Sequence, residues 1–483
     1  MFGLKSVYFY LIALQITIIK LLKKTYFFSN HYNKSLQTKI PQQVYYSPNP
    51  FLLSIITPYK KRYFKINEID PNFFWLKDRK RGQDDLHNFF WVNLIDRKID
   101  EKNLKKIIYI WMLKYSKYQN RIWNSSTLSS RVISWILNID IILNNSTFDF
   151  KKNFLNSIVS QSNHLKKNIK FEKDYFKKIE ILSALILSGL VFKEYEENYK
   201  TGIKELETLV KNFFDSDGFP LTRNPNDLIF FTRYLILCRE IIKDGQKYVP
   251  EFLEIIIEKN LTCIKFIRCA NGDIPLFNGA SENKLDQFDK FIESQKKGKI
   301  TNNTLGGLFK IKSKNHLVFF DVGDPPKKSF SKSYQSGPLS FEYYLDGVKI
   351  ITNCGFGNNI SNKAELLSRL TACQSTLTLN DTAVTKFERN KLINRVFGNS
   401  IKNSFKTYDL EYKNEKDLIG CVVTHSGYEK NFGCTHKREI CLDKENGYIK
   451  GCDNIIKKKD GIPIRYVFRF HINPKLSVVK TMN

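Results

Sequence analysis

Three loops hold the residues whose types and spacing could do chemistry on a polar ligand. Each combines glycine or proline with amides, charged groups or a cysteine: 217–225 (DGFPLTRNP), 271–279 (NGDIPLFNG) and 353–357 (NCGFG). Asp-Gly and Asn-Pro pairs are also favoured in ordinary turns, for backbone reasons alone. Because functional side chains gather on loops that a rigid scaffold holds, these loops are the first candidates for a site.

Histidine and cysteine, the usual metal ligands and nucleophiles, are spread thinly along the chain. None of the seven histidines lies four residues from another, and the nine cysteines include no C-x-x-C pair. Walker, G-x-G-x-x-G, H-E-x-x-H and G-x-S-x-G motifs are also missing from the sequence. We therefore expect no metal ion, no cofactor, and buried free thiols rather than a disulfide framework.

The balance of charges is strongly positive. Lys and Arg number 77 against 48 Asp and Glu, a net charge of +29, in a chain of 483 residues with 42% apolar residues. This composition excludes a disordered or collagen-like protein and favours an anionic partner: nucleic acid, an acidic lipid surface or an acidic polysaccharide. We find no nucleic-acid-binding module and expect no nucleic acid partner.

Two halves with different hydrophobic periods must position the loops. From about residue 84 to 269 the apolar residues recur at helical spacing, in eight or so segments that form a bundle, an α-solenoid or a closed ring of hairpins. After about residue 305 the period is two, which predicts an antiparallel sandwich. The expected strands are 308–313, 317–322, 340–345, 348–352, 377–379, 419–424, 438–442 and 466–470. The polar segment 282–304 is the expected linker.

The N-terminus carries an apolar run, 7–19 (VYFYLIALQITII), between Lys5 and the basic cluster Lys20, Lys23 and Lys24. The run is shorter than the ~20 apolar residues that span a bilayer. Three interpretations stay open: an uncleaved helix in the membrane interface, a helix that packs on the core or a partner, and a signal sequence. The following stretch, to about residue 72, is expected to wrap the domain as an arm.

The order of several motifs resembles the heparinase II/III family of polysaccharide lyases, especially the group common in alphaproteobacteria. In the helical half these motifs are 131–135 (RVISW), 181–190 (ILSALILSGL) and the loops at 217–225 and 273–279. In the second half they are 339–342 (LSFE), 353–355 (NCG), 369–377 (RLTACQSTL), 427–428 (GY), 436–438 (HKR) and 469–471 (RFH). The resemblance covers most of the chain, from roughly residue 89 to 471.

The resemblance implies a fold and an activity. The fold is an N-terminal arm (1–80), an incomplete α/α toroid of helical hairpins (81–281) and, after the linker, an antiparallel β-sandwich (305–483) that ends early, with an unfinished sheet. The activity is β-elimination on an acidic polysaccharide. An Asn or His neutralises the uronate carboxyl, and a Tyr or His moves the proton. Since a tyrosine starts near pKa ~10, such a site must stabilise its phenolate.

Most of the family's catalytic positions carry other residues here. Phe176-Lys177 stands where active members have Asn-His, and the string 222–228 (TRNPNDL) replaces Glu-x-Ser-Pro-x-Tyr-His. Replacement residues are therefore expected for each role. The candidate catalytic residues are Tyr334, Gln335, Asn224 and Tyr234. The candidate substrate-binding residues are Arg223, Asn278, Lys177, Gln374 and Arg369. Of the two possible bases, Tyr334 and Tyr234, the first lies beside a position that usually carries catalytic chemistry.

The family's zinc-binding positions are changed as well. The His, Asp, His set that binds zinc in some members corresponds to Gln335, Asn353 and Gln374 in this sequence. Neutral amides are poor zinc ligands, so the resemblance also predicts that no zinc is bound.

Three functions are compatible with these features. The leading hypothesis is an envelope-associated, lyase-like protein that acts on an anionic glycan. The alternatives are a catalytically degenerate glycan-binding protein of the same fold, and a basic peripheral membrane scaffold whose arm and lysines bind acidic lipid. We expect a location in the cell envelope, periplasmic or peripheral to the inner membrane.

Overall fold

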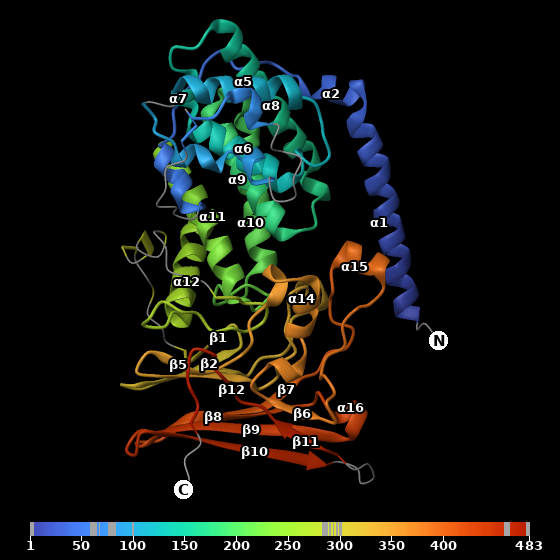
Figure 1. Cartoon of the computed structure of the whole chain (residues 1–483), viewed down its shortest axis with the longest axis vertical. Coiled ribbons are helices and arrows are strands. Elements are labelled where there is room, and N and C mark those ends of the chain that lie inside the picture. Colours follow the sequence, from blue (N-terminus) through green and yellow to red (C-terminus); the bar gives the residue numbers. More distant parts are fainter. Residues whose placement is uncertain are drawn as a thin grey trace.

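The computed structural model describes residues 4–57, 65–66, 68–75, 84–98, 101–282, 288, 291–292, 294–295, 298, 302–457 and 464–479. Helices fill one end of the elongated molecule and sheets fill the other (Figure 1). The expected order, a helical domain followed by an antiparallel β-sandwich, is confirmed. The predicted linker lies mainly outside the described residues, but Phe288 and Ile292 within it are buried in the helical core.

The helical domain is an incomplete toroid of hairpins. Its longer helices are α5 (Glu101–Tyr115), α6 (Ser125–Leu137), α8 (Phe148–Asn168), α9 (Tyr175–Val191), α10 (Glu196–Phe213), α11 (Pro225–Asp244) and α12 (Glu251–Ile267). Its shorter segments are α2 (Asn30–Leu36), η1 (Pro50–Ile55), α3 (Pro71–Phe74), α4 (Asp84–His87), η3 (Phe90–Leu94), α7 (Ile139–Leu143), η4 (Ile169–Phe171) and η5 (Lys193–Tyr195).

Helix α9 is the centre of this domain. It contacts α6, α8, α10 and α11, and all its residues from 181 to 189 are buried. An added Cβ at Gly189 would lie 2.2 Å from the backbone nitrogen of Tyr199, so only glycine lets α10 approach this closely. Side-chain caps begin the helices: Asp174 accepts a hydrogen bond at the start of α9, and Asn224 does so at the start of α11.

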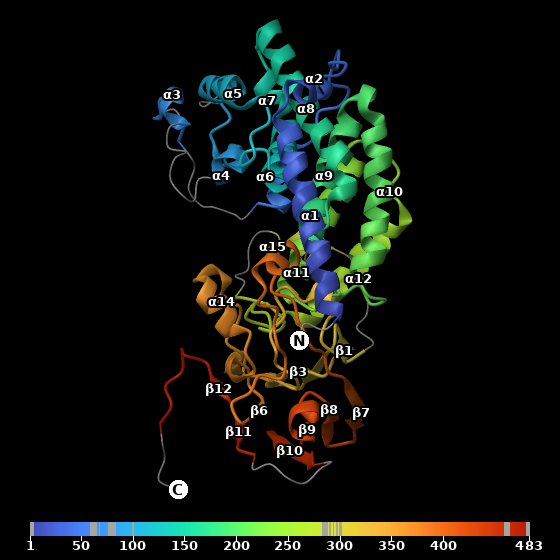
Figure 2. The same cartoon turned by 90° about the vertical axis from the view of Figure 1, so that its right-hand side faces the viewer.

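The N-terminal helix α1 (Leu4–Phe28) is longer than the predicted apolar run and lies along the outside of the molecule (Figures 1 and 2). The segment that follows α1 packs against the helical domain. Its Tyr32 and Leu53 are buried in the helical core, and the hydroxyl of Tyr46 donates to Asp244 at the end of α11. Among the described residues, no helix combines the length and the apolarity that crossing a membrane requires.

Antiparallel strands form the sandwich. One sheet has the order β1 (Thr304–Leu305), β2 (Leu308–Lys312), β3 (His316–Asp321), β4 (Phe341–Leu345), β5 (Val348–Thr352) and β12 (His471–Ile472). The second has the order β10 (Tyr448–Lys457), β9 (Cys434–Asp443), β8 (Leu418–His425) and β7 (Thr407–Asn414), and a third pairs β11 (Tyr466–Phe468) with β6 (Leu377–Leu379). Apolar side chains from the first two sheets meet in one core: Phe309, Ile311, Val318, Phe320, Cys421, Val423, Ile440 and Leu442.

Short helices lie on the side of the sandwich that faces the helical domain (Figure 1). They are η6 (Lys328–Phe330), η7 (Gly357–Asn359), α14 (Asn362–Ser368), η8 (Thr371–Cys373) and α15 (Lys391–Phe397), while α16 (Glu429–Phe432) joins β8 to β9.

The expected strands are present, and the Asp346-Gly347 hairpin is confirmed. Both turn residues have positive φ, and Leu345 pairs with Val348 across the turn. Strands β7 and β10 were missed by the period-two pattern. They are edge strands whose residues are mostly exposed, so apolar residues do not alternate along them.

A buried polar network crosses the second sheet from β8 to β10. The N–H of Gly427 donates to Nδ1 of His425 (3.0 Å), so the proton of that ring is on Nε2 and points to Nδ1 of His436 (3.2 Å). The other nitrogen of His436, Nε2, then donates to Asp453 (2.6 Å), whose carboxylate also pairs with Arg438. Each imidazole is satisfied only in its neutral form.

We therefore expect acid to destabilise the protein below about pH 6.5, the unfolded value for histidine. Burial lowers the pKa of His425 and His436, and it lowers that of His164 in the helical domain to about 3. Below pH 6.5 the unfolded chain binds more protons than the folded one. Stability is thus complete above that pH and falls as the pH drops, by up to about 1.4 kcal/mol per pH unit for each ring. Urea unfolding between pH 7.5 and 5 measures the slope. His164→Gln should reduce the slope of unfolding free energy against pH by about one proton. An unchanged slope in that variant would show that His164 does not stay neutral in the folded protein.

Candidate functional site

The loops singled out from the sequence meet where the helical domain contacts the sandwich. The loops at 217–225 and 271–279 come from the end of the helical domain, and the segments at 334–340, 353–357 and 369–376 come from the sandwich. Of the nine predicted site residues, only Lys177 is partly exposed; the buried ones are Tyr334, Gln335, Asn224, Tyr234, Arg223, Asn278, Gln374 and Arg369. Seven of them lie at this closed junction: Arg223, Asn224, Asn278, Tyr334, Gln335, Arg369 and Gln374. Tyr234 lies farther along α11, beside Glu180 of α9.

Arg223 joins the two domains. Its guanidinium donates to the carbonyl oxygens of Gly306 (2.9 Å), Gly307 (3.1 Å), Gly323 (3.2 Å) and Asp324 (2.7 Å), and also to the carboxylate of Asp321. An added Cβ on Gly307 or Gly323 would clash with this guanidinium. Every nitrogen of the side chain is thus used inside the protein, which makes Arg223 a structural clamp in this conformation.

A chain of hydrogen bonds connects the predicted amides. Asn278 donates to the carbonyl oxygen of Arg223 (3.2 Å), and the next N–H, of Gly279, donates to Oε1 of Gln335 (3.0 Å). The amide nitrogen of Gln335 donates to Gly355 (2.8 Å) and to Ser368 (2.9 Å). Gln335 thereby ties the last loop of the helical domain to two loops of the sandwich.

Two of the three residues at the family's zinc positions, Gln335 and Gln374, converge on one point. Gln374 and Gln335 donate to the same carbonyl oxygen, that of Ser368, at 2.9 Å each. Asn353 accepts from the N–H of Ser375, and its buried Nδ2 has no partner. Because both glutamine nitrogens are donors with no lone pair to give, this set does not fit zinc. In the described part of the chain, no three His, Cys, Asp or Glu side chains are grouped so as to hold a metal ion.

Both candidate tyrosine bases are buried. Tyr334 is 1% exposed, and desolvation raises its pKa above the ordinary value. Burial also raises the pKa of Tyr234 well above that value, and the nearby carboxyl of Glu180 adds to the shift. Removing the phenolic proton at neutral pH is therefore opposed at both positions. Arg369, the remaining predicted residue, donates to the carbonyl oxygen of Tyr334 (2.8 Å) and holds its loop.

Two buried carboxyl groups, Glu180 beside Lys177 and Asp227 beside Lys332, were missed by the sequence analysis. Desolvation raises the pKa of Glu180 on α9 to about 7, and that of Asp227 on α11 to about 7. Asp174 raises both further, while Lys177 lowers the pKa of Glu180 and Lys332 that of Asp227. A carboxyl group that titrates near neutral pH can take up or release a proton in catalysis. Glu180 could have been found from the sequence, because it is a charged residue that directly precedes the apolar run of α9.

A buried glutamate, Glu342, supports the junction. It pairs with Lys349 (3.1 Å) and accepts from the backbone N–H groups of Leu276 (3.1 Å) and Asn353 (2.9 Å). It therefore holds a loop of the helical domain against the end of β5.

Two thiols lie beside the glutamines. The N–H of Cys354 donates to the carbonyl oxygen of Cys373 (3.2 Å), and Gln374 approaches the sulfur of Cys354. A separate hydrogen bond from the side chain of Cys354 lowers the pKa of Cys373 to about 7, against the effect of burial, and the positive charge of Arg469 lowers it further. Cys373 is thus the more nucleophilic thiol of the pair. All nine cysteines are free, and six are buried, as the sequence predicted.

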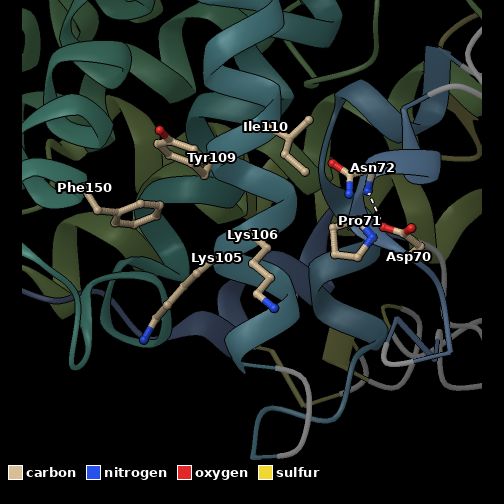
Figure 3. Close-up of a pocket in the computed structure, with 8 residues that line it drawn as sticks. All are labelled: Asp70, Pro71, Asn72, Lys105, Lys106, Tyr109, Ile110 and Phe150. Carbon is tan, nitrogen blue, oxygen red and sulfur yellow. Dashed lines mark hydrogen bonds between the residues drawn. The ribbon is translucent and has the colours of Figure 1, made fainter.

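A surface cavity of about 490 Å³ lies away from this junction, on the helical domain (Figure 3). Lys105, Lys106 and Tyr109 of α5 line it together with Asp70 and Phe150. None of the predicted site residues lines this cavity. The candidate site is therefore the junction between the domains and not this cavity.

Comparison with known proteins agrees with this architecture. The solved structure titled heparan sulfate lyase HepC mutant from Pedobacter heparinus aligns with a TM-score of 0.59 and 17% identity, over 89% of this chain and 73% of that one. A structure of heparinase III aligns with a TM-score of 0.62 and 15% identity, over 93% of this chain and 78% of that one. No curated protein sequence is significantly similar. At these identities the likeness defines the class: a polysaccharide-lyase fold with a helical toroid and a β-sandwich.

The family follows from the sandwich. Residues 300–483 match the family model described as Heparinase II/III-like, C-terminal. The sandwich is therefore a heparinase II/III-like C-terminal domain, and the resemblance to this family drawn from the motifs is supported.

Proposed function

We propose that the protein is a heparinase II/III-type lyase that cleaves an acidic, uronate-containing polysaccharide by β-elimination. The observation that carries this proposal is the family-matching sandwich, set against a helical domain in a fold shared with heparan sulfate lyases. The net charge of +29 favours binding of an anionic chain. A location in the cell envelope, where such glycans occur, is part of the proposal.

Asp227 is the proposed base. In the string 222–228 it occupies the tyrosine position of the family motif, and its pKa of about 7 suits proton abstraction at neutral pH. Its carboxylate would take the proton from the carbon next to the uronate carboxyl. The electron pair forms the new C=C bond as the C–O bond of the leaving sugar breaks, and a proton then reaches the leaving oxygen. Lys177, at the position of the family's histidine, would offset the charge on the uronate.

A second candidate function is glycan binding without turnover. It is favoured by the burial of Tyr334 and Tyr234, and by the amides that stand at the family's histidine positions. Such a protein still offers the partly exposed Lys177 and the exposed Lys332 to an anionic chain.

A lyase assay on a panel of acidic polysaccharides tests the proposal, with ultraviolet absorbance of the unsaturated product as the readout. We expect activity that survives a chelator and falls at least about a hundredfold in Asp227→Asn. Tyr334→Phe is the matched comparison and should stay within a few-fold of the wild type. If no polysaccharide is cleaved but glycan binding is retained, the result supports glycan binding without turnover. If the protein neither cleaves nor binds any glycan, both proposed functions are contradicted.

A further inference from the structure

The side of helix α1 that faces solvent is apolar. Its exposed residues recur three and four apart, which places them on one face: Val7, Leu11, Leu14, Ile18, Leu21 and Phe28. Further exposed apolar residues flank this stripe: Tyr8, Tyr10, Ile19, Leu22 and Tyr26. Leu11 is 57% exposed and Leu22 is 64% exposed. We call the eleven residues the outward face of α1. A surface helix of a globular protein normally turns such a face toward the core.

The opposite side of α1 is already held by the protein. Near its start, the ring of Phe9 contacts Phe397 of α15, and the ammonium group of Lys328 lies 3.8 Å from its centre. Near its end, Phe27 packs against Tyr32 and Tyr118 of the helical domain. The helix is thus fixed at both ends, and its outward face cannot turn inward without breaking these contacts. Figure 2 shows α1 running along the helical domain toward α15.

The surrounding charge has one sign. The first 67 residues contain ten Lys and Arg and no Asp or Glu. Lys20, Lys23 and Lys24 of α1 line a cavity of about 380 Å³ together with Arg395 of α15. Since a helix is ~10 Å thick, these cations lie within about one Debye length of whatever the outward face contacts.

We propose that the protein docks on an anionic lipid bilayer through the outward face of α1, with the helix lying parallel to the membrane. At 25 residues the helix is about 37 Å long, and an apolar face with lysines on the opposite side is the pattern of an interfacial helix. Aromatic residues at both ends, Tyr8 and Tyr10 at one and Tyr26 and Phe28 at the other, suit the headgroup region. The proposal concerns the membrane and is independent of lyase activity.

A second copy of the chain is a poorer occupant. The spacing of the stripe would suit a two-stranded coiled coil, but the apolar surface is wider than such a seam needs. The lysines of α1 would also find no acidic partner on a facing α1, because that helix contains no Asp or Glu. Lipid headgroups supply the missing negative charge.

Co-sedimentation of the full chain with vesicles tests the proposal. Vesicles of phosphatidylglycerol and phosphatidylethanolamine are compared with vesicles of phosphatidylcholine alone. We expect binding to the anionic vesicles that weakens in high salt and is at least tenfold weaker on the neutral ones. Leu11→Glu/Ile18→Glu should reduce binding at least about a hundredfold, because two buried side chains are lost from the bilayer.

The matched control is Leu113→Glu/Ile255→Glu, which makes the same change at exposed apolar positions of α5 and α12. It should bind within about twofold of the wild type. Equal loss in both double variants, or no wild-type binding to anionic vesicles, would overturn the proposal. A wild-type dimer that Leu11→Glu/Ile18→Glu converts to a monomer, measured by light scattering, would overturn it in favour of a second copy.

Discussion

Arg223→Ala is expected to destabilise the protein by about 3–5 kcal/mol, the cost of removing one partner from a buried ion pair. The substitution leaves the carboxylate of Asp321 and four carbonyl oxygens without their donor, at the contact between the domains. Arg223→Lys should recover less than half of the loss, because an ammonium group cannot reach these acceptors as a planar fork does. Urea unfolding with circular dichroism measures both variants.

Two further variants make this test specific. Arg223→Ala/Asp321→Asn should cost less than the sum of the single changes, since the charge stranded by the first is removed by the second. Arg465→Ala, which breaks an ion pair with Asp381 on the surface, should cost under about 1 kcal/mol. If Arg223→Ala folds with wild-type stability but binds glycan more weakly, the structural role of Arg223 between the domains is contradicted. Arg223 is then a substrate-binding residue, as the sequence alone predicts.

Zinc binding is expected to appear in Gln335→His/Asn353→Asp/Gln374→His. The two glutamine nitrogens converge on the carbonyl oxygen of Ser368, and the unpartnered Nδ2 of Asn353 becomes a ligand oxygen in the variant. We expect one zinc ion per chain with a dissociation constant below about 1 μM, measured by calorimetry. Zinc at a hundred times that constant should then stabilise the variant by about 2.7 kcal/mol.

The metal-free triple variant should itself be less stable, by about 1–3 kcal/mol for each buried group that loses its partner. Gln335→Leu/Asn353→Asp/Gln374→Leu is the control, because it loses the same hydrogen bonds and gains no imidazole. It should not bind zinc. If Gln335→His/Asn353→Asp/Gln374→His folds but takes up no stoichiometric zinc, the three positions do not share one ligand point.

The strands and helices could be predicted wherever one face is buried. Every second residue of β2, β3, β8 and β9 faces the sandwich core, and α9 is apolar all round after Glu180 because helices surround it. Edge strands β7 and β10 face solvent on most positions, so no burial pattern marked them. The length of α1 was underestimated for a related reason: its lysines end the apolar run at residue 19, but not the helix.

The candidate site was found in part. The loops at 217–225, 271–279 and 353–357 do meet, and the residues chosen from them lie in one hydrogen-bond network. Their burial could not be foreseen, because it depends on partners far away in the chain. Asp227 was overlooked because a carboxylate at a helix start resembles an ordinary first-turn residue. Only desolvation between the two domains gives it a pKa near 7.

The sequence by itself determined the two-domain order, the positive charge and the resemblance to the heparinase II/III family, since hydrophobic period, composition and motif order are local properties of the chain. The tertiary structure decided what the polar residues do. Arg223 and Asp321 are 98 residues apart in sequence, yet they form a buried pair that closes the junction. The same holds for α1, whose apolar residues are visible in the sequence. Contacts with α15 and the helical domain decide which of its faces is left for another surface.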